Sequence, residues 1–357
     1  MWDAHFYTTP NVSGKFLITG GYVASLDDSL GDFPNGAVLV EDNIIKAVGR
    51  AEDISAPDAE IIDASEGVVI PGMMDTHQHV SMSLTWGIGV DQHLWHFLSN
   101  TYLRWLPSTS VEDLKGLKES GIRAFFGFMH PGHVYIHNTN LTDHEMGLIA
   151  KSGGKIALSA DADVQMGMGY PPSDLLSSTV YDRPSIRLQL QVQRGLDHNA
   201  EHKARRPALK MDFTARDGLI WATRNGAKAV GMEDKIGTLT PGKRADIVIL
   251  TSKRCLSGSA NPFGTAVMHS TPADVDFVMV DGKVMKRDGH FVNVDVPAIR
   301  KKAREGLQRI LENLKTARPE LTQAGIENFF RMGEKSHRAN VAEAYVHGAE
   351  VGDYLRG

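Results

Sequence analysis

Residues 68–79 read VVIPGMMDTHQH, and the interpretation of the whole chain begins from this stretch. A short apolar strand leads into a Pro-Gly bend at Pro71-Gly72, and two histidines follow two residues apart. Side chains at positions i and i+2 of a strand point to the same face, so His77 and His79 present two imidazoles side by side. Neutral imidazole is the commonest nitrogen ligand of zinc and related divalent metals. The stretch therefore predicts part of a metal site at the carboxyl end of a strand.

The composition of the chain is close to that of an average globular protein. Of its 357 residues, 42% are hydrophobic and 23% are charged, and the formal net charge is −5. This charge argues against a nucleic-acid or membrane-surface partner held by bulk charge. Cys255 is the only cysteine, so an internal disulfide is impossible and a cytoplasmic location is the simplest interpretation. We expect no signal peptide, and no apolar run approaches the roughly 18 residues that span a bilayer.

Both ends of the chain carry the pattern of short strands. In the N-terminal part, Gly20-Gly21 is expected to turn the chain after a strand at 15–19, and further apolar runs follow. In the later part, Asp281-Gly282 between two apolar runs is a strong signal for a hairpin. The predicted strands are 15–19, 37–41, 44–49, 68–70, 247–250, 276–280 and 283–285. We expect the two regions to combine into one small domain.

Between these regions, predicted strands alternate with helices, which is typical of βα units around a parallel sheet. Strands are predicted at 133–137 and 155–159, and a helix is predicted over about 214–230. Residues 197–206 form a charged, helix-like stretch that we interpret as a solvated face. The chain after residue 297 is charged and also has a helical pattern.

Four stretches of the sequence together resemble the amidohydrolase superfamily, nearest its chlorohydrolase and cytosine/guanine deaminase-like branch. Residues 36–49 resemble strands of the family's N-terminal sandwich, and residues 62–79 resemble the entry into its first barrel strand. Residues 137–145 resemble the histidine after strand 6 with its helix cap, and residues 236–248 resemble the return into the sandwich. The resemblance implies an α/β fold: a TIM-like (β/α)8 metal-dependent hydrolase barrel with its site at the carboxyl ends of the strands, plus a small β-sandwich domain formed from both ends of the chain. The expected domains are 14–65 with 233–296 (composite sandwich), 66–232 (barrel) and 297–357 (helical C-terminal extension).

The resemblance also implies a set of site residues. His77 and His79 would bind the metal, and His137 would orient the attacking water or stabilise the developing charge. The family adds a histidine after strand 5, for which His130 is the candidate, and an aspartate after strand 8, for which Asp182 is the candidate. Asp182 would be both metal ligand and general base. The cofactor implied is one divalent metal ion, zinc first, with iron or manganese as alternatives.

Other interpretations of these residues stay open. His130 precedes Pro131-Gly132 and is otherwise a loop residue, with His133 as a further candidate, and Asp182 is otherwise a turn residue. Asp161 and Asp163 are alternative oxygen donors, although we expect them in a solvated loop. His93 and His96 are adjacent on a predicted helix, where they either line the substrate pocket or lie on an ordinary surface. 

The spacing of the candidates departs from the family's pattern. A complete (β/α)8 barrel takes about 250 residues, or roughly 30 for each βα unit, so residues 66–232 are some 80 residues short. Only about 58 residues separate His79 from His137. We therefore expect an incomplete barrel, whose exposed strand edges favour a homo-oligomer.

Two classes of function follow. The first is a metal-dependent amidohydrolase that hydrolyses a C–N bond, by deamination or amide cleavage, or a related bond, in a small heterocyclic molecule. The second is a degenerate homologue without hydrolytic activity, which is a binding or regulatory module or catalyses a lyase or isomerase step. No nucleic-acid or membrane partner is expected for either.

Overall fold

The computed structural model describes residues 14–76, 87–102, 104, 134–136, 154–170, 179–180, 183–251, 259–316, 322, 324–325, 327–328 and 331. The chain divides into two compact units, residues 1–80 with 117–299 and residues 81–116 with 300–357. Among the described residues, no helix is both long enough and apolar enough to cross a bilayer.

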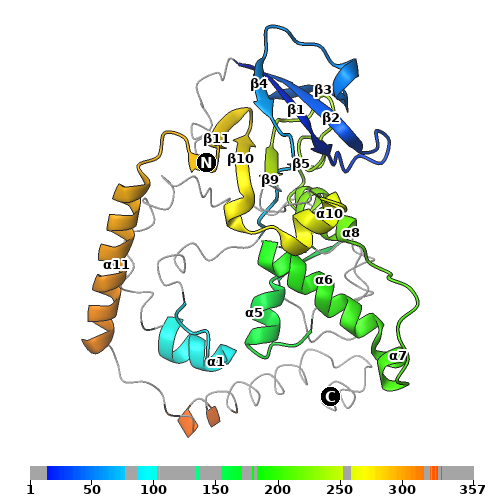
Figure 1. The fold of residues 1–357 in the computed structure, drawn as a ribbon. Coiled ribbons are helices and arrows are strands. Elements are labelled where there is room, and N and C mark those ends of the chain that lie inside the picture. Colours follow the sequence, from blue (N-terminus) through cyan, green and yellow to red (C-terminus); the bar gives the residue numbers. More distant parts are fainter. Residues whose placement is uncertain are drawn as a thin grey trace, which may run out of the picture. The chain divides into compact units, whose positions relative to one another are not determined.

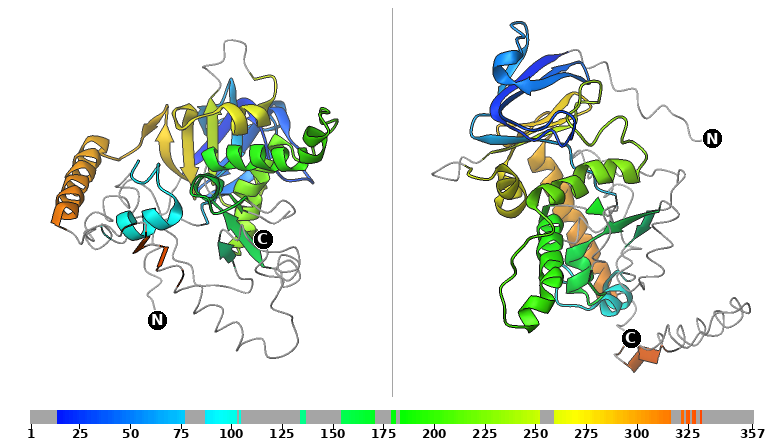
Figure 2. Two further views of the ribbon diagram at one scale, coloured as in Figure 1. Left: turned by 90° about the horizontal axis from the view of Figure 1, so that it is seen from below. Right: turned by 90° about the vertical axis from the view of Figure 1, so that its right-hand side faces the viewer.

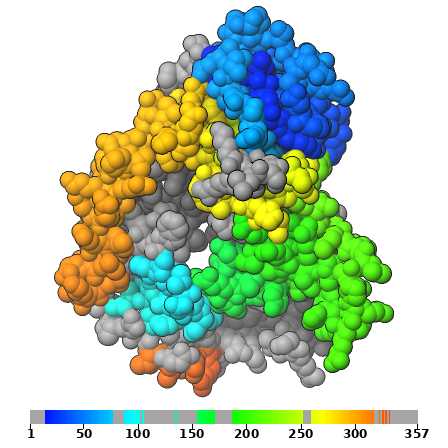
Figure 3. All heavy atoms as spheres, viewed as in Figure 1, coloured from blue at the N-terminus to red at the C-terminus, as the bar shows by residue number. Residues whose placement is uncertain are grey.

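A mixed sheet joins strands from both ends of the chain in the first unit (Figure 1). Its order within the described residues is β12-β11-β10-β9-β5-β1-β2-β3, and β4 pairs with β1. The strands are β1 (Lys15–Val23), β2 (Phe33–Glu41), β3 (Ile44–Arg50), β4 (Glu60–Asp63), β5 (Gly67–Pro71), β9 (Ile247–Thr251), β10 (Val275–Val280), β11 (Lys283–Arg287) and β12 (His290–Phe291). The early strands, in blue, and the late strands, in yellow, also lie against one another in the space-filling view (Figure 3).

Strands β5 and β9 form the junction of this sheet, and both are covered on their two faces. Val69 and Ile249 belong to one hydrophobic core, whereas Val68 and Leu250 belong to another. Adjacent residues of a strand point to opposite faces, so a strand buried on both sides needs an unbroken apolar run. This explains why residues 68–70 are all apolar.

Apart from η2, which lies beside β2, the helices of the first unit lie at one end of the sheet (Figure 2). Ile186, Leu190 and Leu219 from these helices share the second core with β5 and β9. The elements are η2 (Ala51–Asp53), α5 (Ala160–Gln165), α6 (Arg183–Asp197), α7 (Asn199–Lys203), α8 (Ala215–Ile220), the π-helical η6 (Trp221–Asn225), α9 (Gly226–Ala229), α10 (Pro262–Gly264), the π-helical η7 (Thr265–His269) and η8 (Pro272–Asp274). The predicted helix over 214–230 is therefore confirmed, and a capping box between Thr214 and Asp217 begins it.

A second, parallel sheet of three strands has the order β6-β7-β8. Its strands are β6 (Val134–Ile136), β7 (Lys155–Leu158) and β8 (Thr179–Val180). Both neighbouring pairs are parallel, as the predicted βα pattern requires.

The second unit contains α1 (Leu94–His96), the π-helical η4 (Phe97–Tyr102) and most of α11 (Val296–Thr316). The guanidinium of Arg104 donates to the carbonyl oxygens of Asn100 (3.2 Å) and Leu314 (3.3 Å), which ties the end of η4 to α11. A helix after residue 297 is thus confirmed.

Two local predictions about glycine had different outcomes. The hairpin at Asp281-Gly282 is confirmed: φ is 51° and 76° at these residues, which suits the two-residue turn between β10 and β11. The turn predicted at Gly20-Gly21 is wrong, because β1 continues through both glycines with a shift of register, as at a β-bulge. Gly20 has φ +91°, and a Cβ at Gly21 would meet the carbonyl oxygen of Ala64 at 2.5 Å. The glycine pair therefore permits a β-bulge and a close contact with the Ala64 carbonyl, and it does not form a turn.

Candidate active site

Two backbone hydrogen bonds hold the segment that leaves β5 and leads to His77 and His79. The N–H of Gly72 donates to the carbonyl oxygen of Asp246, and the N–H of Met74 donates to that of Ala222, both at 2.8 Å. These bonds fix the backbone up to three residues before His77. His77 and His79 themselves lie outside the described residues.

The carboxyl ends of β6, β7 and β8 meet at one edge of the parallel sheet. Ile136 pairs with Ala157, and Leu158 pairs with Val180, so the three strands end almost level. In sequence, His137 follows β6 directly, Asp161 follows β7 after two residues, and Asp182 follows β8 after one. His130, His133, His137 and Asp182 lie outside the described residues, so the topology gives the strand ends that precede them and not their side chains.

Asp161 and Asp163 lie in the first turn of α5, directly after β7. Asp163 is fully buried, and its Oδ2 accepts the N–H of Ser159 at 3.3 Å. Asp161 is partly exposed, and its Oδ1 accepts the hydroxyl of Ser159 at 3.2 Å. The expectation of a solvated loop is therefore wrong for both, because the chain turns into a helix at Ala160, and carboxylates in a first turn are favoured by the helix dipole.

His93 and His96 lie in the second unit, at the start of α1. Their ring centroids are 5.9 Å apart, and Nδ1 of His93 accepts the N–H of His96 at 3.3 Å. His93 is thus the N-cap of α1. Its cap bond gives this histidine a local structural role that the sequence pattern did not indicate.

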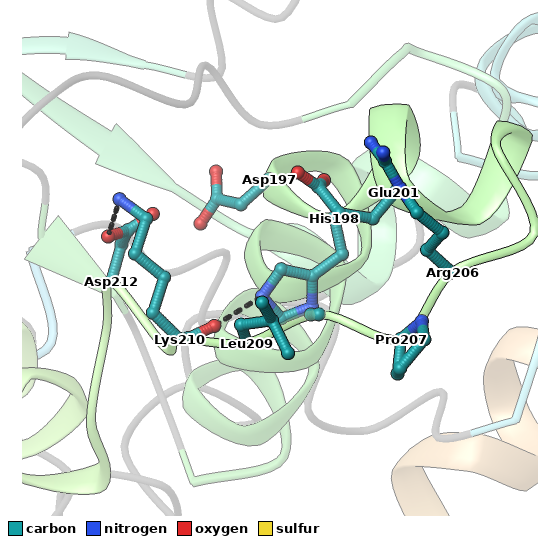
Figure 4. Close-up of a pocket in the computed structure, with 9 residues that line it drawn as sticks. Asp197, His198, Glu201, Arg206, Pro207, Leu209, Lys210 and Asp212 are labelled. Carbon is teal, nitrogen blue, oxygen red and sulfur yellow. Dashed lines mark hydrogen bonds and ion pairs between the residues drawn. The ribbon is translucent and has the colours of Figure 1, made fainter.

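One pocket of about 530 Å³ opens beside α7, away from the candidate residues in sequence (Figure 4). Nε2 of His198 lies 3.1 Å from the carbonyl oxygen of Lys210, and the Lys210 ammonium pairs with Asp212 at 2.8 Å. This ion pair raises the pKa of Lys210. The charge pattern over 197–206 predicts a solvated face and does not reveal the concavity, because the concavity depends on the return of the chain at 207–212.

The pocket does not contain a metal-binding set. Within the part of the chain that the structure describes, no three His, Cys, Asp or Glu side chains come close enough together to hold a metal ion. The lining mixes acidic and basic groups: Asp197, His198, Glu201, Arg206, Pro207, Ala208, Leu209, Lys210 and Asp212. We therefore do not assign the candidate chemistry to this pocket.

Comparison with known proteins agrees with this arrangement. The profile of the amidohydrolase family matches residues 146–285. The chain is thus similar to amidohydrolases, and the proteins that resemble it in sequence or fold include deaminases and chlorohydrolases.

Two curated relatives illustrate the similarity. The 5-methylthioadenosine/S-adenosylhomocysteine deaminase of Desulforudis audaxviator is 27% identical over 219 residues, which are 58% of this chain and 50% of that protein. The 5'-deoxyadenosine deaminase of Methanothermobacter thermautotrophicus is 30% identical over 170 residues, which are 46% of this chain and 39% of that protein. The chain thus spans about half the length of these relatives, or less.

Solved structures share the fold. A zinc-bound adenosine deaminase from Xanthomonas campestris superposes with a TM-score of 0.69 at 16% identity, covering 85% of this chain and 100% of the other. The zinc complex of an atrazine chlorohydrolase from Arthrobacter aurescens gives a TM-score of 0.68 at 16% identity, covering 82% of this chain and 100% of the other. These likenesses show that the chain shares the fold of these two enzymes.

Proposed function

We propose that the chain is a metal-dependent amidohydrolase that hydrolyses a C–N bond in a small heterocyclic molecule. The observation that carries the proposal is the shared edge at which β6, β7 and β8 end, within three residues of His137, Asp161 and Asp182 in sequence. Barrel enzymes place their chemistry at the carboxyl ends of parallel strands. We further propose that the parallel sheet is part of a shortened (β/α) barrel over 66–232, beside a sandwich domain of 14–65 and 233–296.

The donor set fits one divalent metal, with zinc as the first choice. His77, His79 and His130 supply imidazole nitrogens and Asp182 supplies a carboxylate, which are ligand types that zinc prefers. The second candidate for the carboxylate is Asp161, which the structure places beyond the end of the central strand. When bound, the metal would lower the pKa of a water molecule so that hydroxide is available near neutral pH.

Side chains of the protein would accept and donate the protons that the reaction transfers. The acidic residue accepts a proton as water adds to the carbon that bears the amino group, and it returns a proton to the departing nitrogen. The C–N bond breaks, ammonia leaves and the carbonyl oxygen of the product comes from water. His137 would hold the attacking oxygen in place or stabilise the negative charge that develops on the ring.

The named activities of the relatives suggest the substrate class. Both curated relatives are deaminases of adenosine derivatives altered at the 5' position. We propose that this chain deaminates the 6-amino group of a purine nucleoside of that kind. Release of ammonia from 5'-deoxyadenosine, 5-methylthioadenosine and S-adenosylhomocysteine tests the class, with cytidine as the comparison substrate.

Metal content tests the proposal most directly. Purified protein should contain about one equivalent of zinc, iron or manganese, as expected for a mononuclear site. The double variant His77→Ala/His79→Ala should lose the metal and the activity, whereas His290→Ala, an exposed histidine on β12, should keep both. Stoichiometric metal in the double variant would remove the assigned role of the pair.

A homologue without hydrolytic activity is the second candidate function. It is favoured by the short interval of about 58 residues between His79 and His137, and by the parallel sheet, which has three strands within the described residues. This alternative predicts protein without bound metal, even after incubation with zinc, and no release of ammonia. Binding of the same nucleosides without turnover would then support a binding module.

We also propose that the chain assembles with copies of itself. Strands β6 and β8 are the edges of the described parallel sheet, and exposed strand edges pair readily. Light scattering at several protein concentrations should give a mass above that of one chain. A single-chain mass at every concentration would contradict this proposal.

A further inference from the structure

The backbone before His77 depends on an element that lies far away in the sequence. Met74 donates its N–H to the carbonyl oxygen of Ala222 at 2.8 Å, and Ala222 lies in the π-helical turn η6. Trp221 and Ala222 of this turn belong to the core that also contains Val68 and Ile70 of β5. The turn η6 is therefore a fixed support for the chain that leaves β5.

The π-helical turn explains why the Ala222 carbonyl is used in this way. In an α-helix, the N–H of Gly226 would donate to Ala222. Here the N–H of Gly226 donates to the carbonyl oxygen of Thr223. The bond that Gly226 would give to Ala222 in an α-helix is replaced at this carbonyl by the bond from Met74, and such departures are frequent at functional positions.

Gly226 makes the approach of Met74 possible. A Cβ at this position would lie 2.5 Å from the Cβ of Met74 and 3.3 Å from its Cγ, closer than side chains pack. The backbone of Gly226 is ordinary right-handed helix, with φ −58° and ψ −48°. Alanine is normally preferred over glycine in such a conformation, so helix geometry does not account for the glycine. The close approach of Met74 does.

We propose that Gly226 is a positioning residue for the metal-binding segment that contains His77 and His79. Its bare Cα lets Met74 reach the Ala222 carbonyl, and this bond fixes the backbone three residues before His77. The inference rests on the proposed function, since it assigns Gly226 a role toward the metal. It requires no contact between Gly226 and the metal itself.

The test compares Gly226→Ala with Gly195→Ala. Gly195 is an exposed glycine of α6, and a Cβ there would meet nothing within 4 Å. Zinc affinity is measured by competition with a chelator, and amide hydrogen exchange of residues 67–76 is measured on metal-free protein. Gly226→Ala should weaken zinc binding by about 10- to 100-fold, as loss of supporting interactions around metal ligands does. It should also speed exchange over 67–76, whereas Gly195→Ala should change neither.

A second substitution separates positioning from a general loss of stability. Met74→Gly removes the Cβ that the new alanine would meet, so Gly226→Ala/Met74→Gly should match Met74→Gly alone in zinc affinity and in exchange. This pair is compared even if Gly226→Ala alone does not fold. A double variant that remains as impaired as Gly226→Ala would overturn the proposal, as would normal zinc affinity and exchange in Gly226→Ala. Wild-type protein that binds no zinc would remove the proposed function, and the exchange data would still decide whether Gly226 positions the segment.

Discussion

The carboxylate of Asp27 holds the loop after β1 in place through three hydrogen bonds. Its Oδ1 accepts the N–H and the hydroxyl of Ser29 at 2.9 and 2.6 Å, and its Oδ2 accepts the hydroxyl of Thr240 at 2.6 Å. These donors favour the charged form and lower the pKa of Asp27 from 3.8 to about 2. Because the pKa is lower in the folded state, the stabilisation is complete above about pH 4 and is lost as the pH falls toward 2.

We expect Asp27→Asn to lower the free energy of unfolding at neutral pH by about 1 kcal/mol, a value reduced for the partial exposure of the carboxylate. Denaturant unfolding at a series of pH values should show the difference from wild type shrinking below about pH 4, where the wild-type carboxylate begins to gain its proton. Asp53→Asn, at an exposed aspartate of η2, is the control. A difference that is constant across this range would contradict the assignment.

Asp182 and Asp161 are the two candidates for the catalytic acid. We expect Asp182→Asn to lower the deamination rate by about 10²- to 10⁴-fold, as the loss of a general base does. Asp161→Asn should then keep most of the activity, measured as ammonia release. The reverse result would move the acid from the end of β8 to the end of β7. Asp163→Asn should act on stability instead, because Asp163 is buried and accepts the N–H of Ser159.

Most of the strand pattern is predictable from sequence. The apolar run at 68–70 is a strong local signal for a buried strand. The Asp-Gly pair at 281–282 is a strong local signal for a hairpin turn, because these residues readily adopt the positive φ that the turn requires. The pair Gly20-Gly21 was misread, because a double glycine is equally suited to a turn and to a bulge. The fastening of Met74 by Ala222 was not predictable, since no local pattern indicates which distant carbonyl a strand exit will meet.

The β10–β11 hairpin offers a test of why its glycine is required. Gly282 has φ +76°, and a Cβ there would clash with the carbonyl oxygen of Asp42. Gly289 has nearly the same φ, +74°, but a Cβ would meet nothing within 4 Å. Gly289→Ala should therefore cost only the left-handed backbone strain, about 1–2 kcal/mol, and Gly282→Ala should cost about 1–3 kcal/mol more. Equal losses in denaturant unfolding would show that the contact with Asp42 is not important.

For the whole molecule, the family resemblance found in the sequence agrees with the fold, whereas the complete site does not follow from the strands. The motif at 68–79 and the segment at 236–248 are far apart in sequence, yet β5 and β9 pair directly in the structure. The sequence therefore contained the signals for the joined ends. It could not place His130 or Asp182, because local patterns do not fix where residues after a strand lie in space, and both lie outside the described residues.

Metal binding by His77 and His79 should therefore raise the thermal stability of the folded chain. A ligand that binds only the folded chain stabilises it by RT ln(1 + [L]/Kd), which is about 2.7 kcal/mol at a free concentration 100 times Kd. His77 and His79 follow β5, a strand buried in both cores of the first unit, so metal held by them should resist unfolding of that unit. Thermal unfolding of the metal-free protein should shift upward on addition of zinc, and further as the zinc concentration rises. The His77→Ala/His79→Ala variant should show no such shift, while His290→Ala should respond like the wild type. An equal response in all three proteins would mean that zinc binds elsewhere on the chain, and that the histidine pair is a remnant of the family's site.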